Sequence, residues 1–208
     1  MAAGSLTVAV GPGIAPAMND SGAHMGDFWV FGYGSLMWRP GFAHIETQRA
    51  RLFGYRRALC VTSHIHRGSV EKPGLVLGLD KGGSCVGLAF RVPGDLEEEV
   101  MAYLRERELV TNVYKERRLN IRLRGGGNVE AVSYVVDREH RQYAGHLSAE
   151  EAAVRVRGAV GRSGANEDYV LNTVAHLEAM RIRDHWLEQV AALIAPQRAP
   201  GEGPRPVP

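Results

Sequence analysis

The stretch Val30-Phe31-Gly32-Tyr33-Gly34-Ser35-Leu36-Met37-Trp38 decides the fold, because it joins an extended apolar run to a turn bracketed by two glycines. Residues 28–31 predict a strand that delivers the backbone into this turn. The glycines carry no Cβ and can adopt φ > 0, so the amides of residues 34–36 can point at one oxyanion or carboxylate. The stretch has neither the lysine nor the third glycine of a nucleotide-binding loop. It therefore predicts either a tight strand-end turn or an anion-holding loop.

Composition narrows the classes of protein to consider. With 208 residues, 45% of them hydrophobic and 23% charged, the chain fits one globular domain with a well-buried core. The net charge is only +2, and the densest basic groups, Arg117-Arg118 and Arg122-Arg124, lack interleaved aromatics, so we expect no nucleic-acid partner. Cys60 and Cys85 lie far apart without a C-x-x-C pair, which indicates reduced, buried thiols in a cytoplasmic protein.

The two ends differ from the middle of the chain. Residues 1–26 are rich in Ala, Gly, Ser and Pro, and the Val8-Ala9-Val10 patch is far shorter than the apolar region of a signal peptide. We expect a disordered arm over residues 1–26, with Met25 as an alternative start, one domain over residues 27–195, and a disordered Pro-rich tail over residues 196–208. No apolar run approaches the roughly 20 residues that span a bilayer, so we expect no membrane partner. We also expect a monomer.

Between these ends the periodicity is mixed. Apolar runs predict five further strands, over residues 52–62, 75–79, 85–92, 119–123 and 129–136, with Gly125-Gly126-Gly127-Asn128 joining the last two as a hairpin. Helix starts are indicated by Asp95, Ser148, Asn166 and Asp184, and two of these, Asp95 and Ser148, have a glutamate three residues later. Strands followed by helices predict an α+β fold whose sheet is mostly antiparallel.

The predicted helix from Leu96 ends in a charged pair, Arg107-Glu108. The apolar residues of this helix, Leu96, Val100, Tyr103 and Leu104, form a stripe along one face. At about 100° per residue, Glu108 lies on the flank of this stripe, so its side chain is directed toward the protein body. The negative pole of the helix and partial burial both raise the pKa of a carboxyl there, as a general base near neutrality requires. The spacing also allows Glu108 to be an ion-pair partner of Arg105, Arg107 or Lys115. Both interpretations stand at this point.

Five stretches in order resemble the ChaC-type γ-glutamylcyclotransferases. The glycine stretch at 30–38 is the signature of that family, and four others agree with it over roughly residues 27–194. They are His66-Arg67-Gly68 with Lys72-Pro73-Gly74, Gly87-Leu88-Ala89-Phe90-Arg91-Val92-Pro93, Arg107-Glu108, and Gly161-Arg162-Ser163-Gly164-Ala165-Asn166-Glu167-Asp168-Tyr169. The resemblance implies a γ-glutamylcyclotransferase-like fold, a small mixed, mostly antiparallel β-barrel flanked by helices.

The resemblance also implies a reaction and its residues. The α-amine of a γ-glutamyl group attacks its own side-chain amide carbonyl, and for glutathione the products are 5-oxoproline and cysteinylglycine. Glu108 matches the catalytic glutamate of the family, whereas Glu99, on the same helix, is expected to be structural. The expected substrate-binding residues are Phe31, Gly32, Tyr33, Gly34, Ser35, Leu36 and Tyr143.

No cofactor or metal is expected. His64 and His66 form an H-x-H pair, but no third ligand lies close in sequence, so a loop role is favoured over a metal site. Two alternatives to glutathione cleavage remain. The enzyme can act on other γ-glutamyl amines or amino acids, or the chain can be a non-catalytic partner that regulates cation transport. Glu108 at a costly helix end and the intact glycine stretch favour an enzyme.

Overall fold

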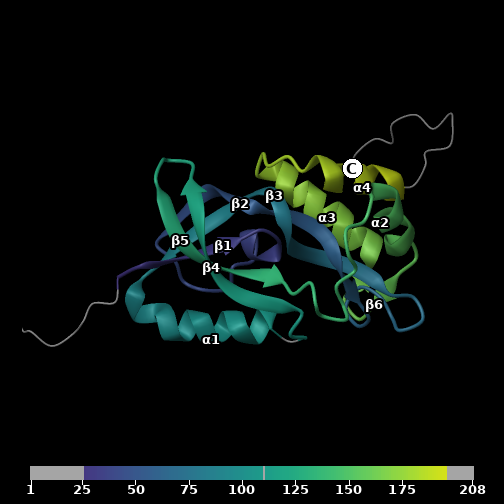
Figure 1. Cartoon of the computed structure of the whole chain (residues 1–208), viewed down its shortest axis with the longest axis horizontal. Helices are drawn as coiled ribbons and strands as arrows, with labels where there is room; N and C mark the ends of the chain where they lie inside the picture. The colour runs from purple at the N-terminus through teal and green to yellow at the C-terminus, as the bar shows by residue number, and fades with distance from the viewer. Residues whose placement is uncertain (1–25, 110, 196–208) are drawn as a thin grey trace, which may run out of the picture.

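A five-stranded closed β-barrel forms the centre of the molecule (Figure 1). The computed structural model describes residues 26–109 and 111–195, so the predicted disordered ends, apart from Gly26, lie outside it. The strands are β1 (Phe28–Gly32), β2 (Glu46–Ser63), β3 (Gly74–Val92), β4 (Tyr114–Leu123) and β5 (Asn128–Val136). Their order around the barrel is β1-β3-β2-β4-β5. A separate two-stranded ribbon pairs β6 (Val160–Gly161) with β7 (Gly164–Ala165).

The predicted mixed, mostly antiparallel barrel is confirmed. Each neighbouring pair in the order is antiparallel, and the barrel closes through a short parallel contact between β1 and β5 at Trp29 and Val30. The β4–β5 hairpin turns at the predicted glycines. β1 pairs with only the last part of β3, from Leu88 to Val92, so the first half of β3 has one edge that no strand of the described residues covers.

The prediction of separate strands at 75–79 and 85–92 is wrong, because β3 runs through both without a break. The polar residues between them stay in the sheet because β2 is nearly as long and pairs alongside them. A register shift at Gly54, where Gly82 and Gly83 at positive φ face one residue of β2, absorbs one extra residue of β3. Asp80 is fully buried there and is held by the guanidinium groups of Arg56 and Arg138.

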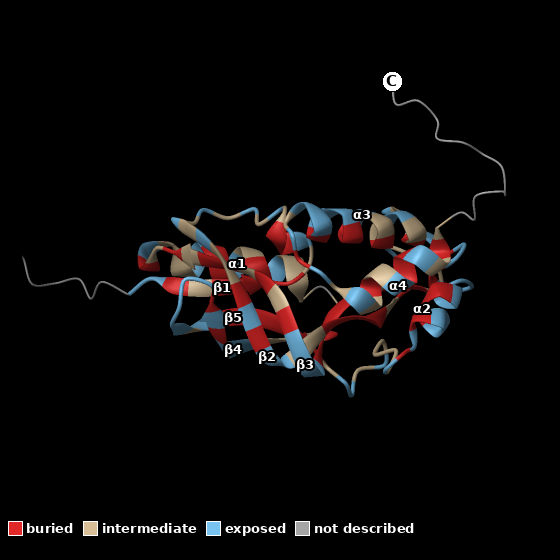
Figure 2. Ribbon diagram, turned by 90° about the horizontal axis from the view of Figure 1, so that it is seen from above, coloured by how far each residue is buried: buried red, intermediate tan, exposed pale blue. Residues whose placement is uncertain are grey.

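Helices flank the barrel on two sides (Figure 1). α1 lies along one side, and three C-terminal helices lie on the other, with their buried positions turned inward (Figure 2). The helices are α1 (Glu97–Glu108), α2 (Ala149–Val156), α3 (Asn166–Ala179) and α4 (His185–Ile194), and the 3-10 turns are η1 (Ser35–Met37) and η2 (Gly94–Leu96). No helix in the described ranges is both long and apolar enough to cross a membrane.

The sequence identifies some of the helix caps but not others. Ser148 forms the predicted capping box with Glu151, and Asp184 caps α4 through the amide of Leu187. The prediction that Asp95 caps α1 is wrong, since Asp95 lies inside η2 and the residue before α1 makes no side-chain cap. Val100, Met101 and Leu104 pack α1 against the outer face of the barrel, which brings the C-terminal end of α1 toward the loop after β1.

Candidate active site

The loop after β1 presents free backbone donors. Gly34 precedes the 3-10 turn η1, whose first hydrogen bond runs from Met37 N–H to the carbonyl of Gly34. Among the described residues, the amides of Gly34, Ser35 and Leu36 donate no hydrogen bond. Unpaired amides at the start of a helical turn attract an anion.

The two loop glycines do not use the left-handed backbone that is open to them. Gly34 has φ −135°, and Gly32 is not among the glycines with positive φ. The requirement at Gly32 is instead one of space, because a Cβ there would lie 3.1 Å from the Cβ of Leu36. At Gly34 a Cβ would make an ordinary 3.6 Å contact with Leu77 Cδ1. The turn therefore folds tightly back on Gly32, whereas Gly34 has room beside it.

Glu108 is the last residue of α1 and lies at this loop. Its side chain is 19% exposed, and its one ion-pair partner among the described residues is Arg107, with Nε 3.2 Å from Oε1. Burial raises the pKa of the Glu108 carboxyl above its ordinary value, and the charge of Arg107 opposes that shift. The predicted raised pKa is thus present together with the alternative ion pair, so the two interpretations of Glu108 do not exclude each other.

Glu108 and the loop share one small cavity, about 90 Å³ in volume. Its lining residues are Tyr33, Gly34, Ser35, Leu36, Val76, Leu77, Glu108, Tyr114 and Tyr169. Glu108, Tyr114 and Val76 also line a larger groove of about 830 Å³, where Arg141, His64 and His66 contribute polar side chains. The carboxylate therefore stands where a small cavity meets a wide groove.

Two tyrosines of this cavity were missed by sequence reasoning. The Tyr114 hydroxyl donates to the carbonyl of Leu77 at 2.6 Å, and the Leu77 amide donates to the Tyr169 hydroxyl at 3.2 Å. Burial raises the pKa of Tyr169 to about 12 and that of Tyr114 well above its ordinary value. Both phenols therefore stay protonated near neutral pH and remain hydrogen-bonding groups.

These contacts cover the open edge of β3. Asn166, the first residue of α3, accepts from the Leu75 amide at 2.7 Å and donates to the Leu75 carbonyl at 2.8 Å. Tyr169 follows three residues later on the same helix face and reaches Leu77. The first turn of α3 thus replaces a strand along the edge. The pair of polar residues spaced i, i+3 at a helix start was the available sequence signal.

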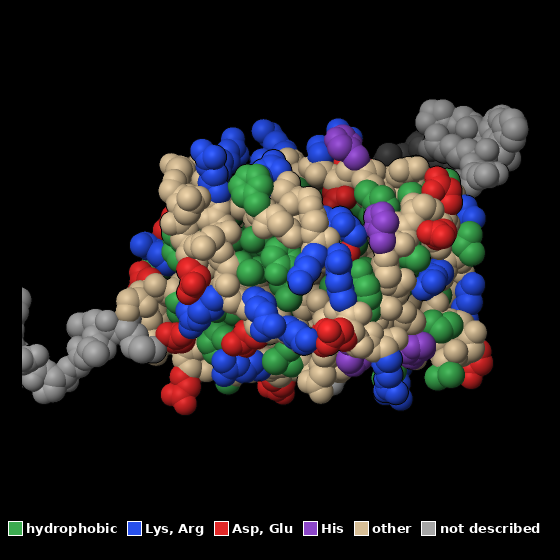
Figure 3. Space-filling view, viewed as in Figure 1, with side chains coloured by type: hydrophobic (Ala, Val, Ile, Leu, Met, Phe, Trp, Pro, Cys, Tyr) green, Lys and Arg blue, Asp and Glu red, His purple; other side chains and the backbone are tan. Residues whose placement is uncertain are grey.

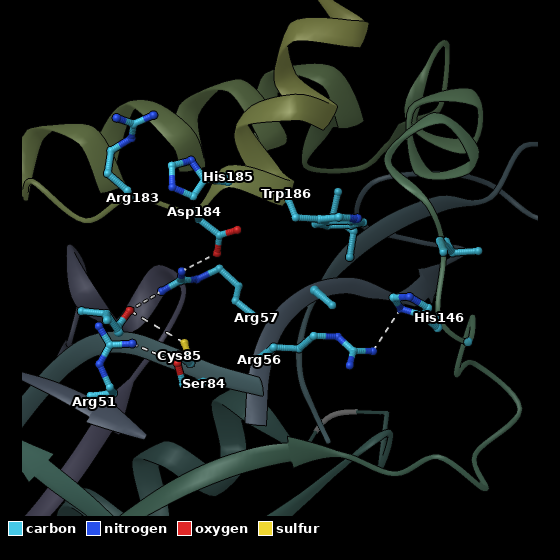
Figure 4. A pocket seen from close by; sticks show the side chains of 15 residues that line it. Arg51, Arg56, Arg57, Ser84, Cys85, His146, Arg183, Asp184, His185 and Trp186 are labelled. Carbon is cyan, nitrogen blue, oxygen red and sulfur yellow. Dashed lines mark hydrogen bonds and ion pairs between the residues drawn. The ribbon is translucent and has the colours of Figure 1, made fainter. Parts of the chain in front are cut away.

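Arg57 on β2 binds the first residue of the loop after β1 by a side-chain hydrogen bond. It is 5% exposed and donates to three groups: the carbonyl of Tyr33 at 2.6 Å, the carbonyl of Val86 at 2.8 Å, and Oδ2 of Asp184 at 2.8 Å. Figure 4 shows its guanidinium directed at Asp184 at the start of α4. Arg57 fixes the first residue of the loop to two other elements, a link that only the folded chain reveals.

Arg107 ties the loop to α1 from the other side. Its guanidinium donates to Ser35 Oγ at 2.9 Å, to the Tyr103 hydroxyl at 2.8 Å and to the carbonyl of Arg39 at 2.6 Å. It also pairs with Glu108. Arg107 therefore connects the end of α1 to the loop through four groups. Ser35 therefore has its hydroxyl engaged by the protein, while its amide stays free.

The structure brings together some predicted site residues and separates others. Tyr33, Gly34, Ser35 and Leu36 line the cavity with Glu108. Phe31 and Gly32 do not line it, and Phe31 is 1% exposed in the hydrophobic core. Tyr143 lies outside both the cavity and the groove, where its hydroxyl donates to the buried carboxylate of Asp80 at 3.2 Å. A buried carboxylate needs such partners, which accounts for the tyrosine.

Other sequence expectations can be placed as well. Glu99 is exposed on α1 and does not line the cavity, and the structural role expected for it stays a prediction. Cys60 and Cys85 are free and buried, as predicted. His66 lies in the bend after β2, where its ring contacts Ser163 Oγ at 3.2 Å. Within residues 26–109 and 111–195, no cluster of three or more His, Cys, Asp or Glu side chains could hold a metal ion.

The closed barrel, the free amides after β1 and the carboxylate at the end of α1 define a protein of the γ-glutamylcyclotransferase fold. A crystal structure of a glutathione-specific γ-glutamyl cyclotransferase from yeast superposes with a TM-score of 0.71, covering 81% of this chain and 96% of that one at 21% identity. The family described as "ChaC-like protein" matches residues 28–197. The chain belongs to this family.

Curated relatives agree with this assignment. A protein of Escherichia coli strain K12 named glutathione-specific γ-glutamylcyclotransferase is 32% identical over 165 residues, which cover 79% of this chain and 71% of that protein. A Danio rerio protein named glutathione-specific γ-glutamylcyclotransferase 1 is 34% identical over 177 residues, covering 80% and 89% respectively. Both span most of the barrel and helices described above.

Proposed function

We propose that this chain is a γ-glutamylcyclotransferase that cleaves glutathione into 5-oxoproline and cysteinylglycine. The observation that carries the proposal is Glu108, a partly buried carboxylate with a raised pKa that shares a small cavity with the unpaired amides of residues 34–36. The names of the relatives in bacteria and fish support the choice of substrate.

The chemistry requires a base and then an acid. The α-ammonium of the γ-glutamyl group has no lone pair, so the Glu108 carboxylate first takes one of its protons. The amine nitrogen then bonds to the γ-carbonyl carbon, and the carbonyl electrons move onto oxygen. When the oxyanion collapses, the bond from that carbon to the leaving nitrogen breaks, and the protonated Glu108 returns its proton to that nitrogen. The ring nitrogen, which became positively charged on attack, then gives its extra proton to the Glu108 carboxylate, which passes it to the released amine, so that 5-oxoproline leaves as a neutral lactam. One residue serves both steps, and the reaction consumes no water.

The loop and the cavity size support the required geometry. The free amides of Gly34, Ser35 and Leu36 can hold either the substrate α-carboxylate or the developing oxyanion. A small cavity that confines the flexible glutamyl chain favours the folded conformation needed for ring closure. The leaving dipeptide would extend into the adjacent groove, where Arg141 and the histidines 64 and 66 offer polar contacts. Tyr143, placed at Asp80, is not part of this proposed site.

The decisive experiment is product analysis with the purified full chain. Glutathione is incubated with the protein in EDTA, and mass spectrometry should detect 5-oxoproline and cysteinylglycine in equal amounts. A parallel panel of γ-glutamyl amino acids and γ-glutamyl amines tests the leaving group. Turnover of the panel but not of glutathione would reassign the substrate, and no turnover of any member would favour a non-catalytic regulatory role. Activity lost in EDTA and restored by a divalent ion would contradict the metal-free mechanism.

The proposal includes a monomer in the cytoplasm. Two free, buried cysteines are compatible with a reducing compartment. Light scattering coupled to size exclusion should give the mass of one chain, and cell fractionation should recover the protein with the cytoplasmic fraction. A mass of two chains, or recovery with another fraction, would contradict this part of the proposal.

A further inference from the structure

A groove on the outer face of the barrel is lined by arginines from three distant parts of the chain. Its volume is about 650 Å³, and it lies between β2, the end of β4 and the turn that joins α3 to α4. We call it the arginine groove, and its six arginines are Arg49, Arg51, Arg122, Arg124, Arg181 and Arg183. In Figure 3, Lys and Arg side chains gather along the upper edge of the molecule, over the region labelled β2 and β3 in Figure 1.

Four of these arginines form a two-by-two array on neighbouring strands. Arg51 on β2 lies directly opposite Arg122 on β4, and the Arg124 amide donates to the carbonyl of Arg49 at 2.8 Å. Neighbouring strands are about 4.8 Å apart, and residues i and i+2 are about 7 Å apart on the same face. Like charges directly opposite each other destabilise a sheet. The repulsion within the array therefore lowers the stability of the fold, and an anion bound between the four side chains would relieve it.

Carboxylates do not neutralise the array. In the described part of the chain, only Arg183 of the six is paired with a carboxylate, that of Glu188, with Nη2 2.6 Å from Oε2. Arg49 donates to the carbonyl of Met180, and Arg51 donates to Ser84 Oγ at 2.9 Å. These neutral acceptors orient the two side chains beside the groove without cancelling their charge.

Arg181 occupies a position that usually holds glycine. It follows α3 with φ +55°, where its amide donates to the carbonyl of Glu178 and the next amide, that of Ile182, donates to the carbonyl of Leu177. This is the Schellman motif, whose left-handed residue is strained unless it is glycine. An arginine at this strained position adds a further positive charge to the groove.

We propose that the arginine groove is a binding site for an oligophosphate, a ligand in which several phosphates are linked in a row. Guanidinium groups match phosphate oxygens in pairs. An acidic peptide strand presents one row of carboxylates, about 7 Å apart, to one face, so it matches a single row of the array and supplies only half as many charges as the array holds. Linked phosphates share a bridging oxygen, so their charges are denser. The six guanidiniums therefore fit an oligophosphate better than they fit a peptide.

An exposed aromatic residue lies at the same groove. Phe53 on β2 is 59% exposed and follows Arg49 and Arg51 on the same outward face of the strand. An aromatic ring beside arginines can stack a nucleobase. Only a nucleoside triphosphate has a base that could stack on this ring, and an inorganic polyphosphate does not. The contribution of Phe53 to binding therefore distinguishes these two sources of the same ligand chemistry.

The test is calorimetric titration of the full chain with sodium tripolyphosphate and with ATP, both without magnesium. We expect saturable binding of one ligand molecule per chain, with an affinity that falls as salt is added. Arg122→Thr and Arg124→Thr should each weaken binding about tenfold, the usual scale for losing a charged hydrogen bond. The matched control is Arg117→Thr, an exposed arginine of β4 outside the groove, which should leave binding unchanged.

A stability measurement separates a functional cluster from an ordinary solvated face. Arg122→Thr and Arg181→Gly should weaken binding while the melting temperature stays the same or rises, because each removes like-charge repulsion and the second also removes backbone strain. Tighter binding of ATP than of tripolyphosphate, lost in Phe53→Leu, would identify the nucleotide as the source. Equal binding would identify the inorganic chain.

Four results would overturn the proposal. The first is that neither phosphate shows saturable binding, and the second is that Arg117→Thr weakens binding as much as the groove variants do. The third and fourth are that poly-L-glutamate, or a single-stranded oligonucleotide, binds at least as tightly as tripolyphosphate. The last two would assign the groove to an acidic protein or to nucleic acid. None of these readouts depends on turnover of glutathione.

Discussion

Replacing Glu108 by glutamine should remove nearly all turnover without unfolding the protein. The amide keeps the size of the side chain and one acceptor oxygen, but it cannot take a proton from the substrate ammonium. Loss of a general base typically costs 10² to 10⁴-fold in rate, or about 3 to 5 kcal/mol of barrier. Substrate should still bind, because the loop amides and the cavity walls are unchanged. We therefore expect a large fall in kcat with measurable glutathione affinity.

The stability of the same variant carries independent information. Burial raises the pKa of Glu108 in the folded state above its ordinary 4.5. Between the ordinary pKa of the unfolded state and the raised pKa of the folded state, the folded state therefore binds more protons than the unfolded state. Glu108 therefore makes the free energy of unfolding fall as pH rises through that window, and above it the buried charge remains a constant cost. Glutamine removes this cost. The melting temperature of Glu108→Gln relative to the unmodified protein should rise as pH increases through the window.

Loss of the ion pair should not reverse this result. Arg107 keeps its hydrogen bonds to Ser35, Tyr103 and the carbonyl of Arg39 when Glu108 is neutral. At pH 7 the variant should thus be at least as stable as the unmodified protein. If Glu108 served only as an ion-pair partner, the variant would be destabilised with kcat nearly intact.

The experiment combines three measurements on two variants. Melting temperature across pH, glutathione affinity by calorimetry and kcat are determined for Glu108→Gln and for the control Glu99→Gln. Glu99 lies on the same helix and loses the same charge, but its side chain is exposed. A destabilised yet active Glu108→Gln would refute the assignment. Lost turnover in Glu99→Gln with normal turnover in Glu108→Gln would transfer the catalytic role to Glu99.

Three further predictions concern the surroundings of Glu108. Gly34→Ala should raise KM and lower kcat in steady-state assays with little change in melting temperature, because the new Cβ makes only an ordinary contact but lies at the cavity. Ser35→Ala should have a milder effect on both constants. Normal kinetics in Gly34→Ala would show that the turn has only a structural role. Arg57→Gln should lower the free energy of unfolding in urea by about 3 to 5 kcal/mol, since it leaves the partly buried Asp184 without its ion-pair partner; a loss below about 1 kcal/mol would contradict that role. Tyr143→Phe should cost about 1 kcal/mol of stability in the same assay with KM unchanged, whereas a raised KM would restore Tyr143 as a substrate contact.

Local signals in the sequence predicted much of the fold. The glycine stretch after an apolar run, the Gly125–Asn128 hairpin and the Ser148 capping box depend on residues a few positions apart, so their chemistry is visible in the sequence. The break expected between 79 and 85 was wrong because pairing with β2 outweighs the turn tendency of two glycines. A strand partner that lies some 25 residues away in sequence leaves no local trace.

The candidate site could be predicted only in part, for the same reason. Glu108 and residues 33–36 belong to two continuous motifs, and the cavity contains both. Tyr114, Tyr169 and Arg57 reach the site from separate elements, and their positions depend on the closure of the barrel and the docking of α3. The arginine groove is similar, because its members are evenly dispersed in sequence and meet only through strand register.

The covering of the β3 edge by Asn166 and Tyr169 has a consequence for synthesis of the chain. Leu75 and Asn166 are 91 residues apart. At 5 to 20 residues per second, the ribosome would need roughly 5 to 18 s to add the first turn of α3 after β3 has begun to emerge. During that interval a row of unpaired backbone groups on β3 would be open to a strand from another nascent chain. The contact that completes the candidate site would thus also end the period in which this protein is most exposed to misassembly.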